Sequence, residues 1–198
     1  MVSKMPNWCN NNLHVTGPEK DIKLFKAAAC APEQTYNDYR SHEGRWKIHD
    51  DIRLKAISQY LPEPGPTVVF SFHGLYPVPE DYRRFPYDCN RAREIGELVG
   101  EPRTQGGYSW EIENWGCKWG AAESYLNHVE PTYLSYAFDT AWAPPLEFLE
   151  TVSSKWPTLS FEIDYAEPGM GFEGTAVYEG GVEVSHEQRE YEYEEDDE

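Results

Sequence analysis

Residues 132–178 constrain the fold more than any other part of the sequence. Large apolar residues alternate with small or polar residues over 134–139 and again over 159–165, which is the pattern of a half-buried strand. Between these runs, a double proline precedes apolar residues at three-residue steps, which predicts a helix over about 145–155. A Glu-Pro-Gly-Met-Gly turn and a further run to Tyr178 then predict a hairpin.

The chain opens with a shorter copy of the same plan. Leu13 and Val15 alternate with polar residues and predict a short strand, and after a Gly-Pro pair a helix is expected from Glu19 to Cys30. Apolar residues at every second position predict the next strand over 67–73. The order strand, helix, strand therefore occurs twice, as in the ferredoxin-like split βαβ fold.

We accordingly expect one α+β domain over 5–184, with an antiparallel sheet, helices on one face and a C-terminal hairpin. Two insertions interrupt it, at about 31–66 and 75–130. The second insertion is helical and aromatic, and 121–128 is expected to add one or two helical turns. Acidic residues dominate from 185 to 198, where few apolar residues other than tyrosines occur, so we expect a disordered acidic tail there.

The charge of the chain limits the class of partner. The sequence has 35 acidic and 17 basic residues, and its formal net charge is −18. Binding to bare nucleic acid needs Lys and Arg side chains that replace counterions, so we expect no direct nucleic-acid binding. The same charge suits a protein partner with a basic surface.

The sequence has no feature that predicts membrane insertion, secretion or cofactor binding. No apolar run approaches the roughly 20 residues of a membrane span, and no apolar signal core is evident near the start, so we expect a cytoplasmic protein. The cysteines, at Cys9, Cys30, Cys89 and Cys117, form no CxxC pair and match no zinc pattern. We therefore expect reduced thiols and no cofactor.

The segment 108–120 is the strongest local anomaly, because four large aromatic residues surround one lysine. In one interpretation Trp115 and Trp119 stack a planar ligand on an exposed loop while Lys118 meets a phosphate or carboxylate. In the other, the segment tucks its tryptophans, including Trp110, over a face of the sheet.

Polar and aromatic residues also flank two predicted strands. Trp8 and Asn10 precede the first strand, and Asp139 and Trp142 follow the third. Taking the two central strands as parallel, we expect these segments at opposite ends of the sheet. They could hydrogen-bond a ligand or position a partner, or serve as turn and cap residues.

Catalytic and metal sites are not expected. Asp164, Glu167 and Glu173 flank the predicted turn, but they lack the spacing of an EF-hand and are interpreted as solvated acids. Cys117 beside Lys118 could be an activated thiol, but no paired histidine is evident. Walker, Rossmann and GxSxG motifs are missing from the sequence, so we expect no enzymatic activity.

Four segments in order resemble the YubB-like proteins of phages and conjugative plasmids. They are MPNWCNNNLHVTGP, FSFHGLYPVPEDY, ENWGCKWGA, and the pair FDTAWAPPLEFL and YAEPGMGFEG, spread over residues 5–174. The resemblance implies a ferredoxin-like domain and an accessory protein of a mobile element in a bacterial cytoplasm. It implies no catalytic residue and no ligand, and it does not extend to the acidic tail. The term ferredoxin-like describes topology here, because an iron–sulfur cluster needs clustered cysteines.

Together these features predict a non-enzymatic binding protein that acts on a protein partner through an acidic and aromatic surface, with counter-defence as a biological role that the mobile-element resemblance suggests. The alternative is a sensor or sponge for a small, nucleotide-like ligand. The candidate binding residues are Trp8, Asn10, Trp110, Trp115, Lys118, Trp119, Asp139 and Trp142.

Overall fold

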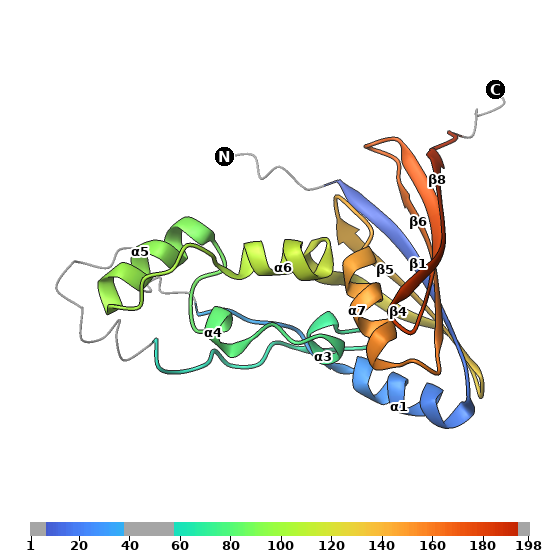
Figure 1. The fold of residues 1–198 in the computed structure, drawn as a ribbon, viewed down its shortest axis with the longest axis horizontal. Coiled ribbons are helices and arrows are strands. Elements are labelled where there is room, and N and C mark those ends of the chain that lie inside the picture. The colour runs from blue at the N-terminus through green and yellow to red at the C-terminus, as the bar shows by residue number, and fades with distance from the viewer. Residues whose placement is uncertain (1–6, 38–57, 194–198) are drawn as a thin grey trace.

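The computed structural model describes residues 7–37 and 58–193, and its centre is a six-stranded antiparallel sheet (Figure 1). The order of strands across the sheet is β4-β5-β1-β6-β7-β8. The strands are β1 (Trp8–Thr16), β4 (Lys118–Glu130), β5 (Tyr133–Ala141), β6 (Ser160–Glu167), β7 (Phe172–Glu179) and β8 (Val182–Glu190).

Helices α1 (Glu19–Ala29) and α7 (Leu146–Lys155) lie on one face of this sheet, together with the rest of the helical part (Figure 1). Both helices bury an apolar stripe, as their three- and four-residue spacing predicts. Phe25 of α1, for example, packs edge-on against Phe161 of β6 with ring centroids 5.3 Å apart. The opposite face of the sheet carries no helix among the described residues.

The predicted ferredoxin-like fold is confirmed, but its second strand is not the predicted one. The core elements run β1, α1, β4, β5, α7, β6, and β6-β1-β5-β4 is the strand order of a split βαβ sheet. The second strand is therefore β4, and the helical turns expected over 121–128 are wrong because those residues lie in this strand.

Residues 67–73, expected to be that strand, adopt a different structure. Only Thr67–Val68 is extended, as β3, and it pairs with β2 (Ala31–Pro32). Ser71 then caps a short helix, α3 (Phe72–Leu75), because its hydroxyl accepts the backbone N–H of Gly74 at 3.1 Å. The alternating phenylalanines fill the core beneath the sheet instead of forming one of its strands.

One long insertion, between α1 and β4, replaces the two that the sequence suggested. Besides β2, β3 and α3 it contains α4 (Glu80–Arg83), α5 (Cys89–Val99) and α6 (Gly107–Trp115), and its part 38–57 lies outside the described residues. Helix α5 projects away from the sheet (Figure 1) and has a small apolar cluster of its own.

The predicted disordered tail begins too early, because Val182–Glu190 forms strand β8 along β7. Every residue of β8 is exposed, which explains why its sequence lacks a core-facing apolar pattern. Its side chains are nevertheless fixed: Arg189 Nε donates to Glu173 Oε1 at 2.7 Å, and His186 Nε2 lies 2.7 Å from the hydroxyl of Tyr165. Residues 5–6 and 194–198 lie outside the described residues.

Within the described ranges, every helix is too short or too polar to cross a membrane.

Candidate functional site

The helix-free face of the six-stranded sheet, called the open face below, carries the exposed side chains of its strands. Alternate residues of β1 point to opposite sides: Leu13 and Val15 are fully buried, whereas Trp8, Asn10 and Asn12 are exposed. The strand register places Asp139 of β5 beside Asn10 on this face. The open face is therefore polar and aromatic.

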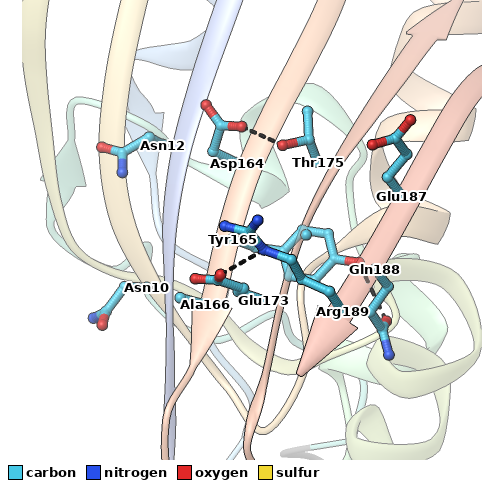
Figure 2. Close-up of a pocket in the computed structure, with 11 residues that line it drawn as sticks. Asn10, Asn12, Asp164, Tyr165, Ala166, Glu173, Thr175, Glu187, Gln188 and Arg189 are labelled. Atoms are coloured by element: carbon cyan, nitrogen blue, oxygen red, sulfur yellow. Dashed lines mark hydrogen bonds and ion pairs between the residues drawn. The ribbon is translucent and has the colours of Figure 1, made fainter. Parts of the chain in front are cut away.

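A groove of about 520 Å³ crosses the open face at β1, β6, β7 and β8 (Figure 2). Its polar lining includes Asn10, Asn12, Asp164, Glu173, Glu187 and Arg189. Three of these side chains are carboxylates and one is a guanidinium, so the groove has a negative charge. The carboxylates come from three neighbouring strands, and this explains why no single stretch of sequence revealed the groove.

A row of contacts between side chains spans four strands of the open face, from β5 to β7. His14 Nδ1 lies 2.7 Å from the hydroxyl of Tyr133, and His14 Nε2 lies 3.5 Å from Asp164 Oδ2. The hydroxyl of Thr175 donates to the other oxygen of Asp164 at 2.5 Å. These side chains hold one another in place, so a binding partner would meet a preorganised surface.

The three acids that flank the predicted turn are separated in the structure, and Glu167 is not the solvated acid that the sequence suggested. Asp164 and Glu173 lie on the open face with the partners just described, whereas Glu167 is buried and accepts the backbone N–H of Met170. Throughout residues 7–37 and 58–193, no three His, Cys, Asp or Glu side chains are arranged to hold a metal ion.

The two flanking segments of the central strands meet at the same end of the sheet, contrary to the prediction. Strands β1 and β5 are antiparallel, so Trp8 pairs with Ala141 and Asn10 with Asp139. The amide of Asn10 donates to Asp139 Oδ1 at 2.7 Å. The expectation of opposite ends was wrong because it assumed parallel central strands, whereas each strand in this topology runs against its neighbours.

Three exposed tryptophans gather at this end, and we call Trp8, Trp119 and Trp142 together the tryptophan cluster. Their exposed fractions are 36%, 43% and 43%. The rings of Trp8 and Trp119 have centroids 6.4 Å apart. The ammonium group of Lys118 lies 4.0 Å from the ring centroid of Trp119 and 6.0 Å from that of Trp142. Six of the eight predicted binding residues therefore lie near one another.

Trp119 and Trp142 have positive φ angles, of 72° and 74°. This left-handed conformation costs a residue with a side chain about 1–2 kcal/mol, and bulky residues rarely adopt it. Both backbones are held by hydrogen bonds: the N–H of Trp119 donates to Glu111 Oε2 at 2.6 Å, and that of Trp142 donates to the carbonyl of Asn7 at 3.0 Å. Strain of this kind is concentrated at functional sites.

Glu111 connects the tryptophan cluster to the interior. It is fully buried, and its carboxylate accepts the hydroxyls of Tyr36 and Tyr87 at 2.7 and 3.0 Å as well as the N–H of Trp119. Burial raises the pKa of Glu111 above its ordinary value, while the hydrogen bonds from Tyr36, Trp119 and Tyr87 oppose this shift. The carboxylate fixes the backbone from which the Trp119 side chain projects.

The other two predicted tryptophans belong to the core. Trp115 is completely enclosed and donates its indole N–H to the carbonyl of Tyr76 at 3.1 Å, and Trp110 is 7% exposed. Neither can stack a ligand, so this part of the prediction is wrong. Cys117 is also fully buried, and burial raises the pKa of its thiol well above the ordinary value, which opposes a nucleophilic role.

Comparisons with known proteins agree with this fold. Residues 114–198 match a family model described as "Ferredoxin-like domain in Api92-like protein". No curated protein matches the chain. A crystal structure of the protein api92 from Yersinia pseudotuberculosis superposes with a TM-score of 0.61 at 11% sequence identity, covering 96% of this chain and 99% of that chain.

The matched segment contains β4, β5, α7, β6, β7 and β8 but not β1, which lies between β5 and β6. The six-stranded sheet therefore needs residues from outside the matched segment. Residues 114–198 are thus similar to the ferredoxin-like domain of Api92-like proteins, and the chain as a whole shares its fold with api92 of Yersinia pseudotuberculosis.

Proposed function

We propose that this protein is a non-enzymatic accessory binding protein that holds a basic protein surface against its open face. The acidic groove would attract the partner, and the tryptophan cluster would supply the apolar anchors. Trp is among the residues that most often carry binding energy, and complementary charge favours encounter and specificity.

The observation that carries this proposal is the position of the tryptophan cluster beside the acidic groove. Asn10 lines the groove and also contacts Asp139, and it lies two residues from Trp8 along β1, so the two features form a continuous surface. Exposed tryptophans next to fixed carboxylates match a basic partner and oppose a bare phosphate backbone.

The biological setting is part of the proposal. The resemblance to proteins of phages and conjugative plasmids favours an accessory role in a bacterial host cytoplasm, and the partner would then be a protein of the host or of a competing element. Counter-defence is the role that we would test first in that setting.

The test is capture from bacterial lysate on immobilised full-length protein, with proteins identified by mass spectrometry. The double variant Asp164→Asn/Glu187→Gln removes two charges from the groove and keeps side-chain shape. The matched control, Glu94→Gln/Glu97→Gln, removes two charges from exposed positions on α5, away from the sheet. We expect a basic protein to be captured by the wild type and the control and lost with the groove variant. Identical capture by all three proteins would refute the proposal.

A nucleotide-like small ligand is the alternative, favoured by the ammonium of Lys118 lying over the ring of Trp119. A base could stack on this indole while Lys118 turns to a phosphate. Nearby carboxylates, such as Asp139, would repel that phosphate. A thermal-shift panel of nucleotides distinguishes the two proposals, because only a small-ligand site predicts a rise in melting temperature.

A further inference from the structure

The tryptophan cluster already has a cation next to it, supplied by the chain itself. The ammonium of Lys118 lies 4.0 Å from the ring centroid of Trp119, within the range at which the negative face of an indole attracts a positive charge. The ring of Trp142 is 6.0 Å from the same ammonium. The free protein thus shows the type of ligand that these rings can hold.

The surroundings of the cluster add a carboxylate to the indole faces. Asp139 lies on the open face of β5, two residues before Ala141, which pairs with both Trp8 and Lys118. Two residues along a strand correspond to about 7 Å. One oxygen of Asp139 accepts the amide of Asn10, which fixes the orientation of the carboxylate. Aromatic faces and a carboxylate are thus within reach of one long cationic side chain.

The backbone at the tryptophan cluster is held by contacts that do not involve the Lys118 side chain. Trp119 and Trp142 are exposed and have positive φ angles, and the backbone N–H of Trp119 donates to the buried carboxylate of Glu111. A cation that leaves these rings would therefore leave a formed site behind. This arrangement suits exchange of one cation for another.

We propose that the tryptophan cluster is a cation-binding site, that Lys118 is its resident cation in the free protein, and that an arginine of a basic partner displaces it. A guanidinium is planar, stacks on aromatic rings and is less strongly hydrated than an ammonium, so it competes well with a lysine for an indole face. Asp139 offers the carboxylate that such a fork of donors binds. This inference rests on the proposed function and names the side chain that the partner contributes.

The test measures binding of a nine-residue arginine peptide and a nine-residue lysine peptide at 150 mM salt, followed by tryptophan fluorescence and by calorimetry. Wild type should prefer the arginine peptide. Trp119→Leu should weaken binding of the arginine peptide about fivefold or more, because it removes the ring that Lys118 now covers. Lys118→Met should strengthen that binding about two- to fivefold, because the competing ammonium is gone.

Further variants distinguish binding at the tryptophan cluster from binding elsewhere on the protein. Tyr60→Leu removes an exposed aromatic side chain elsewhere and should leave binding unchanged. Trp142→Leu is the second cluster variant, to be used if Trp119→Leu does not fold, and melting temperatures show which variants are folded. Asp164→Asn/Glu187→Gln reports the contribution of the acidic groove on its own.

Each outcome decides between the proposals. Weaker binding in the cluster variants together with stronger binding in Lys118→Met supports the cation site. Unchanged binding in the cluster variants, with weaker binding only in the groove variant, overturns the cation site and leaves the proposed function standing. Unchanged binding in all variants counts against both. Displacement of the peptide by adenosine monophosphate, abolished by Lys118→Met, would overturn the site in favour of a nucleotide.

Discussion

Replacing Glu111 tests how the interior supports the surface. Its carboxylate accepts four donors: the hydroxyls of Tyr36 and Tyr87, the side-chain amide of Gln34 and the backbone N–H of Trp119. Glu111→Ala leaves all four without their acceptor. A buried donor that loses its acceptor costs about 1–3 kcal/mol. The half-buried side chains of Tyr36, Tyr87 and Gln34 can recover water, so we assign about 1 kcal/mol to each and about 2 kcal/mol to the Trp119 N–H.

The free energy of unfolding should therefore fall by about 5 kcal/mol in Glu111→Ala, a large fraction of the 5–15 kcal/mol typical of a folded domain. Glu111→Gln keeps the shape and one acceptor oxygen, so its cost should be about 1 kcal/mol. Urea unfolding followed by circular dichroism measures both variants. Equal losses in the two variants, or a loss below about 1 kcal/mol in Glu111→Ala, would refute the role of this carboxylate as the common acceptor.

The pH dependence gives a second readout of the same side chain. The pKa of Glu111 is raised in the folded state by burial, so the folded protein binds this proton more readily than the unfolded chain. Its contribution to stability is fully present below the unfolded pKa of 4.5 and is lost as pH rises through the folded pKa. The difference in free energy of unfolding between the wild type and Glu111→Gln should therefore widen in favour of the wild type as the pH falls. A difference that narrows as the pH falls would contradict this.

Three further predictions concern the core and the sheet. Trp115→Ala should lower the free energy of unfolding by about 3–5 kcal/mol in urea, because the indole is completely enclosed; a loss below 1 kcal/mol would contradict its burial. Burial and the neighbouring Arg83 lower the pKa of His73 to about 4 from 6.5, so its stabilising contribution, present above pH 6.5, should be lost as pH falls to 4. The ring is half-buried, which limits this loss to about 1–2 kcal/mol, and His73→Asn should remove the dependence. Gly174→Ala should lower the melting temperature by about 4–8 °C, since its Cβ would lie 2.5 Å from the hydroxyl of Tyr165; an unchanged value would show that β7 and β8 adjust freely.

The second half of the fold was predictable because its signals are local. Residues 134–139 and 159–165 alternate strictly, and they lie in β5 and β6, while the predicted helix corresponds to α7. Each of these elements places one apolar face on the core, so hydrophobic periodicity alone indicates its type.

Strand β4 could not be predicted in the same way. Its pairing with β5 shifts register at three places, and Trp119, Glu123 and Gly120 have positive φ angles within it. Such bulges interrupt the two-residue period that identifies a strand. Conversely, residues 67–73 show the two-residue period but do not form a strand of the sheet. Their phenylalanines, Phe70 and Phe72, lie in the core on either side of Ser71, which caps helix α3.

The candidate site was predictable in composition but not in arrangement. Trp115 and Trp119 are four residues apart in the sequence, yet one is enclosed and the other exposed. The cause is the end of α6 at Gly116, whose φ of 75° turns the chain between them. Trp8 and Trp142 lie close together because β1 and β5 are antiparallel neighbours. The direction and order of strands in a sheet cannot be predicted from the local sequence around either tryptophan.

The central position of β1 sets an order of events for the growing chain. This strand is synthesised before both of its partners, β5 and β6, which lie beyond residue 132. The sheet therefore cannot close on both sides of β1 until synthesis has reached the end of β6 at Glu167, about five-sixths of the way along this sequence, and contacts between such distant segments form slowly. During that interval the backbone of β1 has no strand to pair with, and unpaired strand edges of this kind make an incomplete chain prone to aggregate.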